Sequence, residues 1–174
     1  MIQKYSRYII MEAFFNCPTT IFMGRELCRI VKLSQSSVIL HLKALLKEGL
    51  ILRSKQGLYG GYIANRDSNL FKVLKTQNIM FRVHKSGLVD FIAKEVQPEC
   101  IVMFGSGTRG EDIEDSDVDI FIEAKECNLD VSLFERKLHR KLHIIFKERF
   151  KDMNPEIKNN IINGIKLYGY IKGF

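Results

Sequence analysis

The chain has 174 residues, 46% of them hydrophobic and 27% charged, which allows one domain or two small ones and excludes a disordered or fibrous protein. It has no run of about 18 apolar residues and no apolar stretch at residues 1–5 that would suit a secretory signal, so we expect a cytoplasmic protein without a membrane segment. Its four cysteines lie far apart with no Cys-x-x-Cys pair, which argues against a zinc ribbon and a disulfide framework.

The net charge of +7 is divided unevenly along the chain. Residues 1–80 hold 12 Lys and Arg against 4 Asp and Glu, whereas residues 81–174 hold 15 against 16. This division favours an N-terminal part that faces a polyanion, joined to a C-terminal part with different chemistry. A solvated basic face without a partner is the other interpretation.

The first part of the chain has the pattern of three helices. Apolar residues at helical spacing predict a helix that ends before Asn16-Cys17-Pro18 and a second over residues 25–31. Ser34 is a good N-cap for a third helix, which ends at Gly49. The buried stripe expected on this third helix consists of Val38, Leu42, Leu45 and Leu46.

Two apolar runs after these helices, over residues 50–54 and 58–64, flank Gln56-Gly57 and predict a β-hairpin. Three helices followed by a hairpin is the order of a winged helix-turn-helix. The residues from Leu33 to Ile51 resemble bacterial and archaeal winged-helix transcription regulators, and the resemblance covers about the first 65 residues. It implies a homodimer that binds double-stranded DNA, with the third helix in the major groove and the wing at phosphates. The residues that it places at the DNA are Gln35, Ser36, Ser37 and Lys43 on the helix and Arg53 and Lys55 on the wing.

The expected recognition helix departs from this family at two positions. Ile39 and Leu40 stand where polar, base-reading side chains are usual. Two bulky apolar residues there suit a protein contact at least as well as DNA.

Residues 68–97 are again helical in pattern, with a break at Ser86-Gly87 and an end at Pro98. We therefore expect a winged-helix domain over residues 1–67, a helical connector over residues 68–86 and a second domain over residues 87–174.

The second domain alternates strands and helices. Residues 100–104 form a continuous apolar run, which predicts a strand buried on both faces. Further strands are expected over residues 118–122 and 142–146, with a helix between them and a last helix that opens at Asn154-Pro155. The fold class is therefore α+β, and the second domain is expected to be a small mixed sheet with helices on one side.

Candidate site residues follow the first of these strands. Gly105 lets the backbone bend sharply, so that its amide groups approach phosphate oxygens, and Ser106 adds a hydroxyl. Arg109 supplies a permanent cation. Asp117 and Asp119 are two residues apart, so on a strand they lie on the same face, where two carboxylates can share Mg²⁺ ions.

The motifs over residues 104–111 and 116–120 resemble those of the minimal nucleotidyltransferases of the polymerase beta superfamily, and the resemblance covers residues 88–170. It implies transfer of a nucleoside monophosphate from a nucleoside triphosphate, with ATP expected, to a hydroxyl of a protein or of an RNA such as a tRNA. Gly105 and Ser106 would bind the triphosphate, and Asp117 and Asp119 would bind Mg²⁺ or Mn²⁺.

The strand over residues 142–146 lacks the third acid that active relatives place there, and has Leu142-His143-Ile144 instead. Glu123 is a poor substitute, because it lies about 13 Å along the strand from Asp119. His143 is either a catalytic base or an ordinary strand residue. The alternative to an enzyme is therefore a winged-helix transcription regulator whose degenerate transferase domain senses nucleotide.

The glycines at positions 105, 107 and 110 also fit a dinucleotide-binding fingerprint. That fold needs a crossover helix after the turn. Residues 111–116 contain only one apolar residue, Ile113, and cannot supply such a helix. A P-loop is excluded as well, because no Gly-Lys-Ser/Thr follows.

Overall fold

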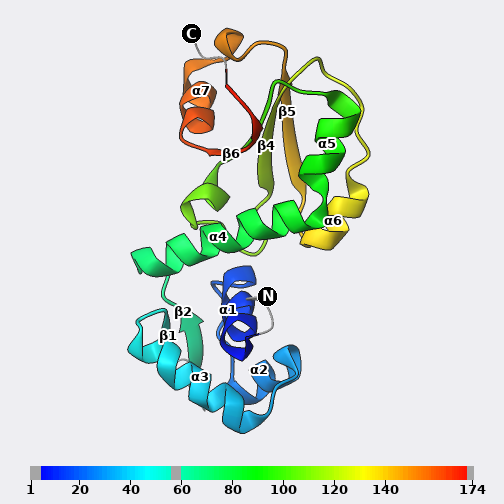
Figure 1. Ribbon diagram of the computed structural model, residues 1–174. Coiled ribbons are helices and arrows are strands. Elements are labelled where there is room, and N and C mark those ends of the chain that lie inside the picture. The colour runs from blue at the N-terminus through cyan, green and yellow to red at the C-terminus, as the bar shows by residue number, and fades with distance from the viewer. Residues whose placement is uncertain (1–4, 56–59, 172–174) are drawn as a thin grey trace. The chain divides into compact units, whose positions relative to one another are not determined.

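The structure of the protein is a computed structural model that describes residues 5–55 and 60–171. Within it the chain forms two compact units, Met1–Asn78 and Ile79–Phe174 (Figure 1). The first unit is helical with a small hairpin, and the second is built on a mixed sheet. This confirms the α+β class and the order of a winged helix followed by a sheet domain.

The first unit contains the three expected helices and two short strands. In chain order they are α1 (Ser6–Asn16), α2 (Gly24–Val31), α3 (Gln35–Lys47), β1 (Ile51–Ser54) and β2 (Gly61–Ala64). Helix α3 begins where the cap predicted, because the Ser34 hydroxyl accepts a hydrogen bond from the Ser37 backbone N–H at 3.3 Å. After α3 the chain turns at Gly49, whose φ of +68° favours glycine.

The core of the first unit lies between its helices and the hairpin. Val38, Leu42 and Leu45 of α3 are buried there, as predicted, and Leu46 is half-buried against the same core. Phe22, between α1 and α2, joins the hairpin through an isolated antiparallel β-bridge. It exchanges two backbone hydrogen bonds with Tyr62 of β2, at 2.8 and 2.9 Å.

Strands β1 and β2 pair antiparallel, from Ile51 opposite Ala64 to Ser54 opposite Gly61. This confirms the predicted hairpin, while the turn expected at Gln56-Gly57 lies outside the described residues.

Two helices follow the hairpin, α4 (Asn69–Ser86) and α5 (Leu88–Val96), and they meet at Gly87, whose φ is +85°. The predicted helical stretch and its break are confirmed. Phe71 of α4 packs in the core of the first unit, whereas Ile79 and Val83 pack in that of the second. The expected domain limits at residues 67 and 86 lie on either side of this shared helix and stay predictions.

The second unit holds a four-stranded sheet with the strand order β5-β4-β3-β6. The strands are β3 (Cys100–Phe104), β4 (Val118–Glu123), β5 (Leu142–Lys147) and β6 (Ile165–Gly169). Strand β4 is parallel to β5, while β3 is antiparallel to both of its neighbours. The first three strands were predicted, and β6 was not.

Apolar side chains cover both faces of this sheet. On one face Val118, Ile120 and Ile122 pack with residues of α5 and of α6 (Ser132–Leu138). On the other face, Phe121 packs with Phe150 and with Ile161 of helix α7 (Pro155–Ile162).

The expectation of helices on one side of the sheet is therefore wrong. Figure 1 shows α7 on one side and α5 and α6 on the other. The physical reason is the strand β3, all of whose residues are buried, so that each of its faces needs a cover. In the described part of the chain, no helix has the length and apolar character to cross a bilayer.

Two leucines of α3 give a matched test of the core of the first unit. Leu42 is 1% exposed and Leu40 is 65% exposed on the same helix. Leu42→Ala should lower the free energy of unfolding by about 2–5 kcal/mol, because it leaves a cavity. Leu40→Ala should change it by less than about 0.5 kcal/mol. Urea unfolding measures both, and equal losses would contradict the assigned core.

Candidate functional site

The turn after β3 is built around Gly105. Its φ of +80° and ψ of −159° lie where side chains are rarely tolerated, and it leads directly into a short 3-10 helix, η2 (Ser106–Arg109). The Thr108 hydroxyl donates to the Gly105 carbonyl at 2.7 Å, and the Glu111 N–H donates to the Ser106 carbonyl at 3.1 Å. The expected sharp bend at Gly105 is confirmed, and its conformation is fixed by local hydrogen bonds.

Asp119 lies directly against this bend. It is paired with Phe104 across the antiparallel strands β3 and β4, which brings its carboxylate beside the residue that follows Phe104. A Cβ atom placed on Gly105 would stand 2.1 Å from Asp119 Oδ2, far inside van der Waals contact. Glycine is therefore required at position 105 for two reasons, its backbone conformation and the carboxylate beside it.

His143 is the neighbour of Asp119 on the other side. The two residues are direct partners in the parallel pair β4 and β5, and His143 Nδ1 lies 2.9 Å from Asp119 Oδ1. Their side chains are 56% and 24% exposed, so both can be reached from solvent. The strand position at which a third acid was expected thus carries an imidazole, in direct contact with the central carboxylate.

Strand β5 is anchored close to this histidine. The Leu142 N–H donates to Glu135 Oε1 at 3.0 Å, and this hydrogen bond holds the pKa of Glu135 below its usual range. The Val118 N–H of β4 donates to the Lys141 carbonyl at 2.9 Å. The starts of β4 and β5 are therefore tied to each other and to α6, which fixes the register that joins Asp119 to His143.

Asp117 lies one residue before β4 and is exposed. The loop that carries it is held by Arg140, whose guanidinium donates to the carbonyls of Ile113 and Ser116 at 2.5 and 2.9 Å. Arg140 also pairs with Asp112 at 3.1 Å, and both side chains are only 6% exposed. The structure thus brings Asp119, Gly105 and His143 together and presents Asp117 at the entrance of the same strand.

Arg109 is placed at the end of η2 and points to solvent. Its Nε donates to Glu111 Oε2 at 2.9 Å, and the two side chains are 56% and 45% exposed. Its role at a nucleotide stays a prediction.

Glu123, at the far end of β4, is buried and engaged in packing. Its carboxylate accepts hydrogen bonds from the Phe150 N–H at 2.9 Å and from the Cys100 thiol at 3.5 Å. Burial, together with the charge of Glu123, raises the pKa of Cys100 to about 12. Glu123 therefore belongs to the core, which agrees with the expectation that it does not replace the third acid.

The donors at the centre of the site suit a divalent cation. Asp119 offers a carboxylate oxygen and His143 a ring nitrogen, side by side at the edge of a turn whose amide groups suit phosphate. Among residues 5–55 and 60–171, no group of three or more His, Cys, Asp and Glu side chains converges on one metal position. Asp119 and His143 are the pair that the structure joins there.

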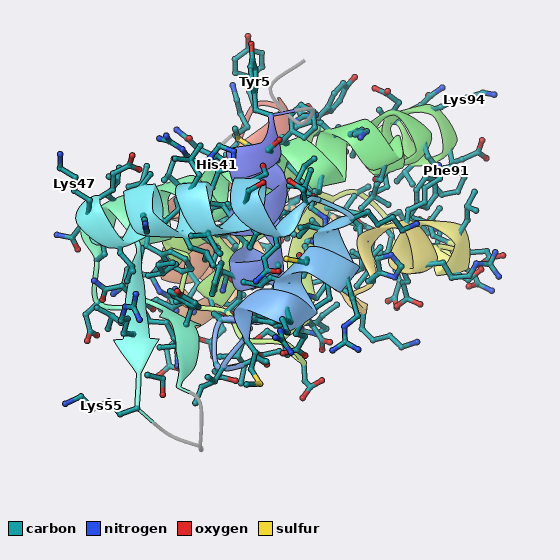
Figure 2. The ribbon with its side chains drawn as sticks, turned by 90° about the horizontal axis from the view of Figure 1, so that it is seen from below. Tyr5, His41, Lys47, Lys55, Phe91 and Lys94 are labelled. Carbon is teal, nitrogen blue, oxygen red and sulfur yellow. The ribbon has the colours of Figure 1, made fainter. Side chains whose placement is uncertain are left out.

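The predicted DNA-binding residues lie on α3 and on the hairpin. Gln35, Ser36, Lys43, Arg53 and Lys55 are exposed, and Ser37 is half-buried beside its cap. Figure 2 shows Lys55 just past the end of β1, away from α3.

A groove of about 890 Å³ runs between α2, the start of α3 and the hairpin. Gln35, Ile39 and Arg53 line it, and the Arg53 guanidinium stacks over the Tyr62 ring at 5.5 Å. The groove also contains Arg25 and Arg29 of α2, which are not among the predicted DNA-binding residues. The sequence signal that could have identified them is their spacing of four residues, which places both cations on one face of the helix.

Comparison with known families agrees with both motifs. Residues 87–170 match the polymerase beta nucleotidyltransferases, and residues 7–52 match the bacterial regulatory proteins of the arsR family. No curated protein matches the chain. The chain thus joins a helix-turn-helix domain of the arsR type to a nucleotidyltransferase domain of the polymerase beta type, which confirms the predicted fusion.

Two glycines of the turn give a matched test of the contact with Asp119. Gly105→Ala should lower the free energy of unfolding by about 1–3 kcal/mol, because of the positive φ and because the carboxylate must rotate away. Gly107→Ala has nothing within 4 Å of the added Cβ, and its effect should stay below about 1 kcal/mol.

Urea unfolding measures the two free energies, and the NMR signals of the His143 ring report whether Asp119 has moved. Equal stabilities of the two variants, or an unchanged His143 ring in Gly105→Ala, would contradict this geometry.

Proposed function

We propose that the protein is a nucleotidyltransferase that moves a nucleoside monophosphate from a nucleoside triphosphate, with ATP expected, to a hydroxyl of a protein or RNA acceptor. The single observation that carries this proposal is the arrangement of Gly105, Asp119 and His143 at the end of β3. It lies inside the segment that matches the polymerase beta nucleotidyltransferases.

The bend at Gly105 supplies the phosphate-binding part of the proposed site. The backbone amides of this turn would donate to phosphate oxygens, and the Ser106 hydroxyl is a further donor. Arg109 adds positive charge at the end of η2. These groups would orient the triphosphate with its α-phosphorus toward Asp119.

Asp117 and Asp119 would hold the divalent ion, Mg²⁺ or Mn²⁺, whose charge neutralises the triphosphate and polarises the α-phosphorus. In the reaction, the acceptor oxygen bonds to the α-phosphorus and the bond from that phosphorus to the β-phosphate oxygen breaks. Pyrophosphate leaves, and the proton of the acceptor hydroxyl passes to solvent water.

The exposure of the site supports a macromolecular acceptor. Asp119 and His143 are 24% and 56% exposed, so the reacting centre is open to solvent near the starts of β4 and β5 rather than enclosed. Small-molecule sites usually bury most of their ligand. A hydroxyl on a protein or on an RNA such as a tRNA fits an open centre better, and we place this reaction in the cytoplasm.

For the first unit we propose binding of double-stranded DNA by a homodimer. The expected contacts are those of Gln35, Ser36, Ser37 and Lys43 with the bases or the backbone and of Arg53 and Lys55 with phosphates. Arg25 and Arg29 extend the basic surface across the groove, and with the described residues neither forms an ion pair. The excess of 12 basic over 4 acidic residues in the first 80 supports a polyanionic partner.

A second candidate function is a transcription regulator that binds nucleotide without turnover. The observation that favours it is His143 at the position where active relatives carry the third acid. In that case the nucleotide would act as a signal for the DNA-binding unit.

Transfer is tested by incubating the protein with each labelled nucleoside triphosphate and Mg²⁺ or Mn²⁺, with and without cell extract. We expect label on a protein or RNA band, reduced at least about 100-fold in Asp119→Asn, which loses the charge but keeps a hydrogen-bonding group for His143. Asp90→Asn, an exposed acid on α5, is the control and should keep full transfer.

The result separates the two candidates. Nucleotide binding without transfer under all conditions supports the regulator. If the protein shows no nucleotide binding and no transfer, both candidate functions are contradicted.

The DNA proposal is tested by the dependence of affinity on salt, measured with a duplex of about 30 base pairs. Arg25→Ala with Arg29→Ala should weaken binding and lower the slope of log affinity against log salt by about 2, because two phosphate contacts are lost. Lys94→Ala removes an exposed cation of the second unit and should leave the slope unchanged. An affinity that does not fall as salt rises would contradict phosphate binding by this surface.

A further inference from the structure

The contact between His143 and Asp119 is set by the backbone. The two residues are direct partners in the parallel strands β4 and β5, and the bond between the Val118 N–H and the Lys141 carbonyl fixes this register at its first residue. This register places the two residues opposite each other, and His143 Nδ1 lies 2.9 Å from Asp119 Oδ1. An ion bound to Oδ1 of Asp119 would therefore lie within reach of the His143 imidazole.

The spacing of the two atoms suits a shared cation. On an octahedral ion with bonds of about 2.1 Å, neighbouring ligand atoms are about 3 Å apart. Nδ1 and Oδ1 stand 2.9 Å apart in a hydrogen bond, which is also the spacing of two neighbouring ligands on such an ion. An ion that both atoms bind would lie to the side of the line that joins them and would replace this hydrogen bond. The 56% exposure of the His143 side chain leaves room for water and phosphate oxygens to complete the coordination.

We propose that His143 is a direct ligand of the catalytic divalent ion and gives this site a preference for first-row transition-metal ions over Mg²⁺. Mg²⁺ takes oxygen ligands and gives up its water reluctantly, whereas imidazole nitrogen is a favoured ligand of transition ions. Replacing the expected third carboxylate by an imidazole therefore lowers the affinity for Mg²⁺ more than that for Mn²⁺ or Co²⁺. The inference rests on the proposed nucleotide site and adds the identity of its metal.

Three histidine variants test the proposal. His143→Asn removes the imidazole at similar size, and His143→Asp supplies the carboxylate that is expected at this strand position. His139→Asn is the control, since His139 is an exposed histidine of the same unit and asparagine tolerates its φ of 52°. Circular dichroism and thermal unfolding verify that each variant is folded.

The first measurement is direct and needs no catalysis. The folded protein is loaded with Mn²⁺ and the α,β-methylene analogue of ATP, and pulsed electron paramagnetic resonance records coupling of Mn²⁺ to a bonded nitrogen nucleus. We expect this coupling in the unmodified protein and in His139→Asn, and its loss in both His143 variants. Binding of Mn²⁺ without nitrogen coupling, coupling that persists in His143→Asn, or no Mn²⁺ binding at all would overturn the proposal.

The second measurement is the ratio of Mn²⁺ to Mg²⁺ affinity, obtained by titration calorimetry with the same analogue. His143→Asp should lower this ratio at least about tenfold, because a third carboxylate restores Mg²⁺ binding. An unchanged ratio would overturn the proposal.

The outcomes also separate this inference from the proposed reaction. Transfer supported by Mg²⁺, with metal affinities unaltered in the His143 variants, leaves the reaction standing and rejects the ligand role. Loss of transfer in His143→Asn with unaltered metal binding would assign His143 as a base, and this result also rejects the ligand role. Nitrogen coupling without transfer retains the ligand role and favours the nucleotide-binding regulator.

Discussion

The candidate site depends on one steric constraint, the close approach of the Asp119 carboxylate to the α-carbon of Gly105. No side chain fits between them, since a Cβ atom on Gly105 would lie 2.1 Å from Asp119 Oδ2. The antiparallel pairing of β3 with β4 sets this approach, and the parallel pairing of β4 with β5 brings His143 to the other oxygen of the same carboxylate. A glycine turn, an acid and an imidazole therefore meet at one end of the sheet because three strands keep their register.

The rest of the second unit holds that register in place. Both faces of β3 are packed, with α5 and α6 against one side of the sheet and α7 against the other. The buried pair of Arg140 and Asp112 secures the loop before β4, and removal of one partner of such a pair is costly. The end of the sheet that carries Asp119 and His143 is thus supported by packing, while it stays open to solvent.

The parts that could be predicted from the sequence are those set by local chemistry. Ser34 caps α3 through its own hydroxyl, and Gly105 follows an apolar strand where only glycine allows the bend. The contact between Asp119 and His143 depends on strand pairing across 24 residues, which no local pattern specifies. Strand β6 was not predicted for the same reason, since its five residues become a strand only by pairing with β3. The position of α7 on the second face was not predicted either, because it depends on the burial of both faces of the sheet.

The most direct test of the account is a crystal structure with Mn²⁺ and a non-hydrolysable nucleoside triphosphate. We predict phosphate oxygens at the amides of Gly105 and Ser106, and an ion that touches both Asp119 and the triphosphate. A nucleotide bound elsewhere in the second unit, or an ion remote from Asp119, would contradict the account.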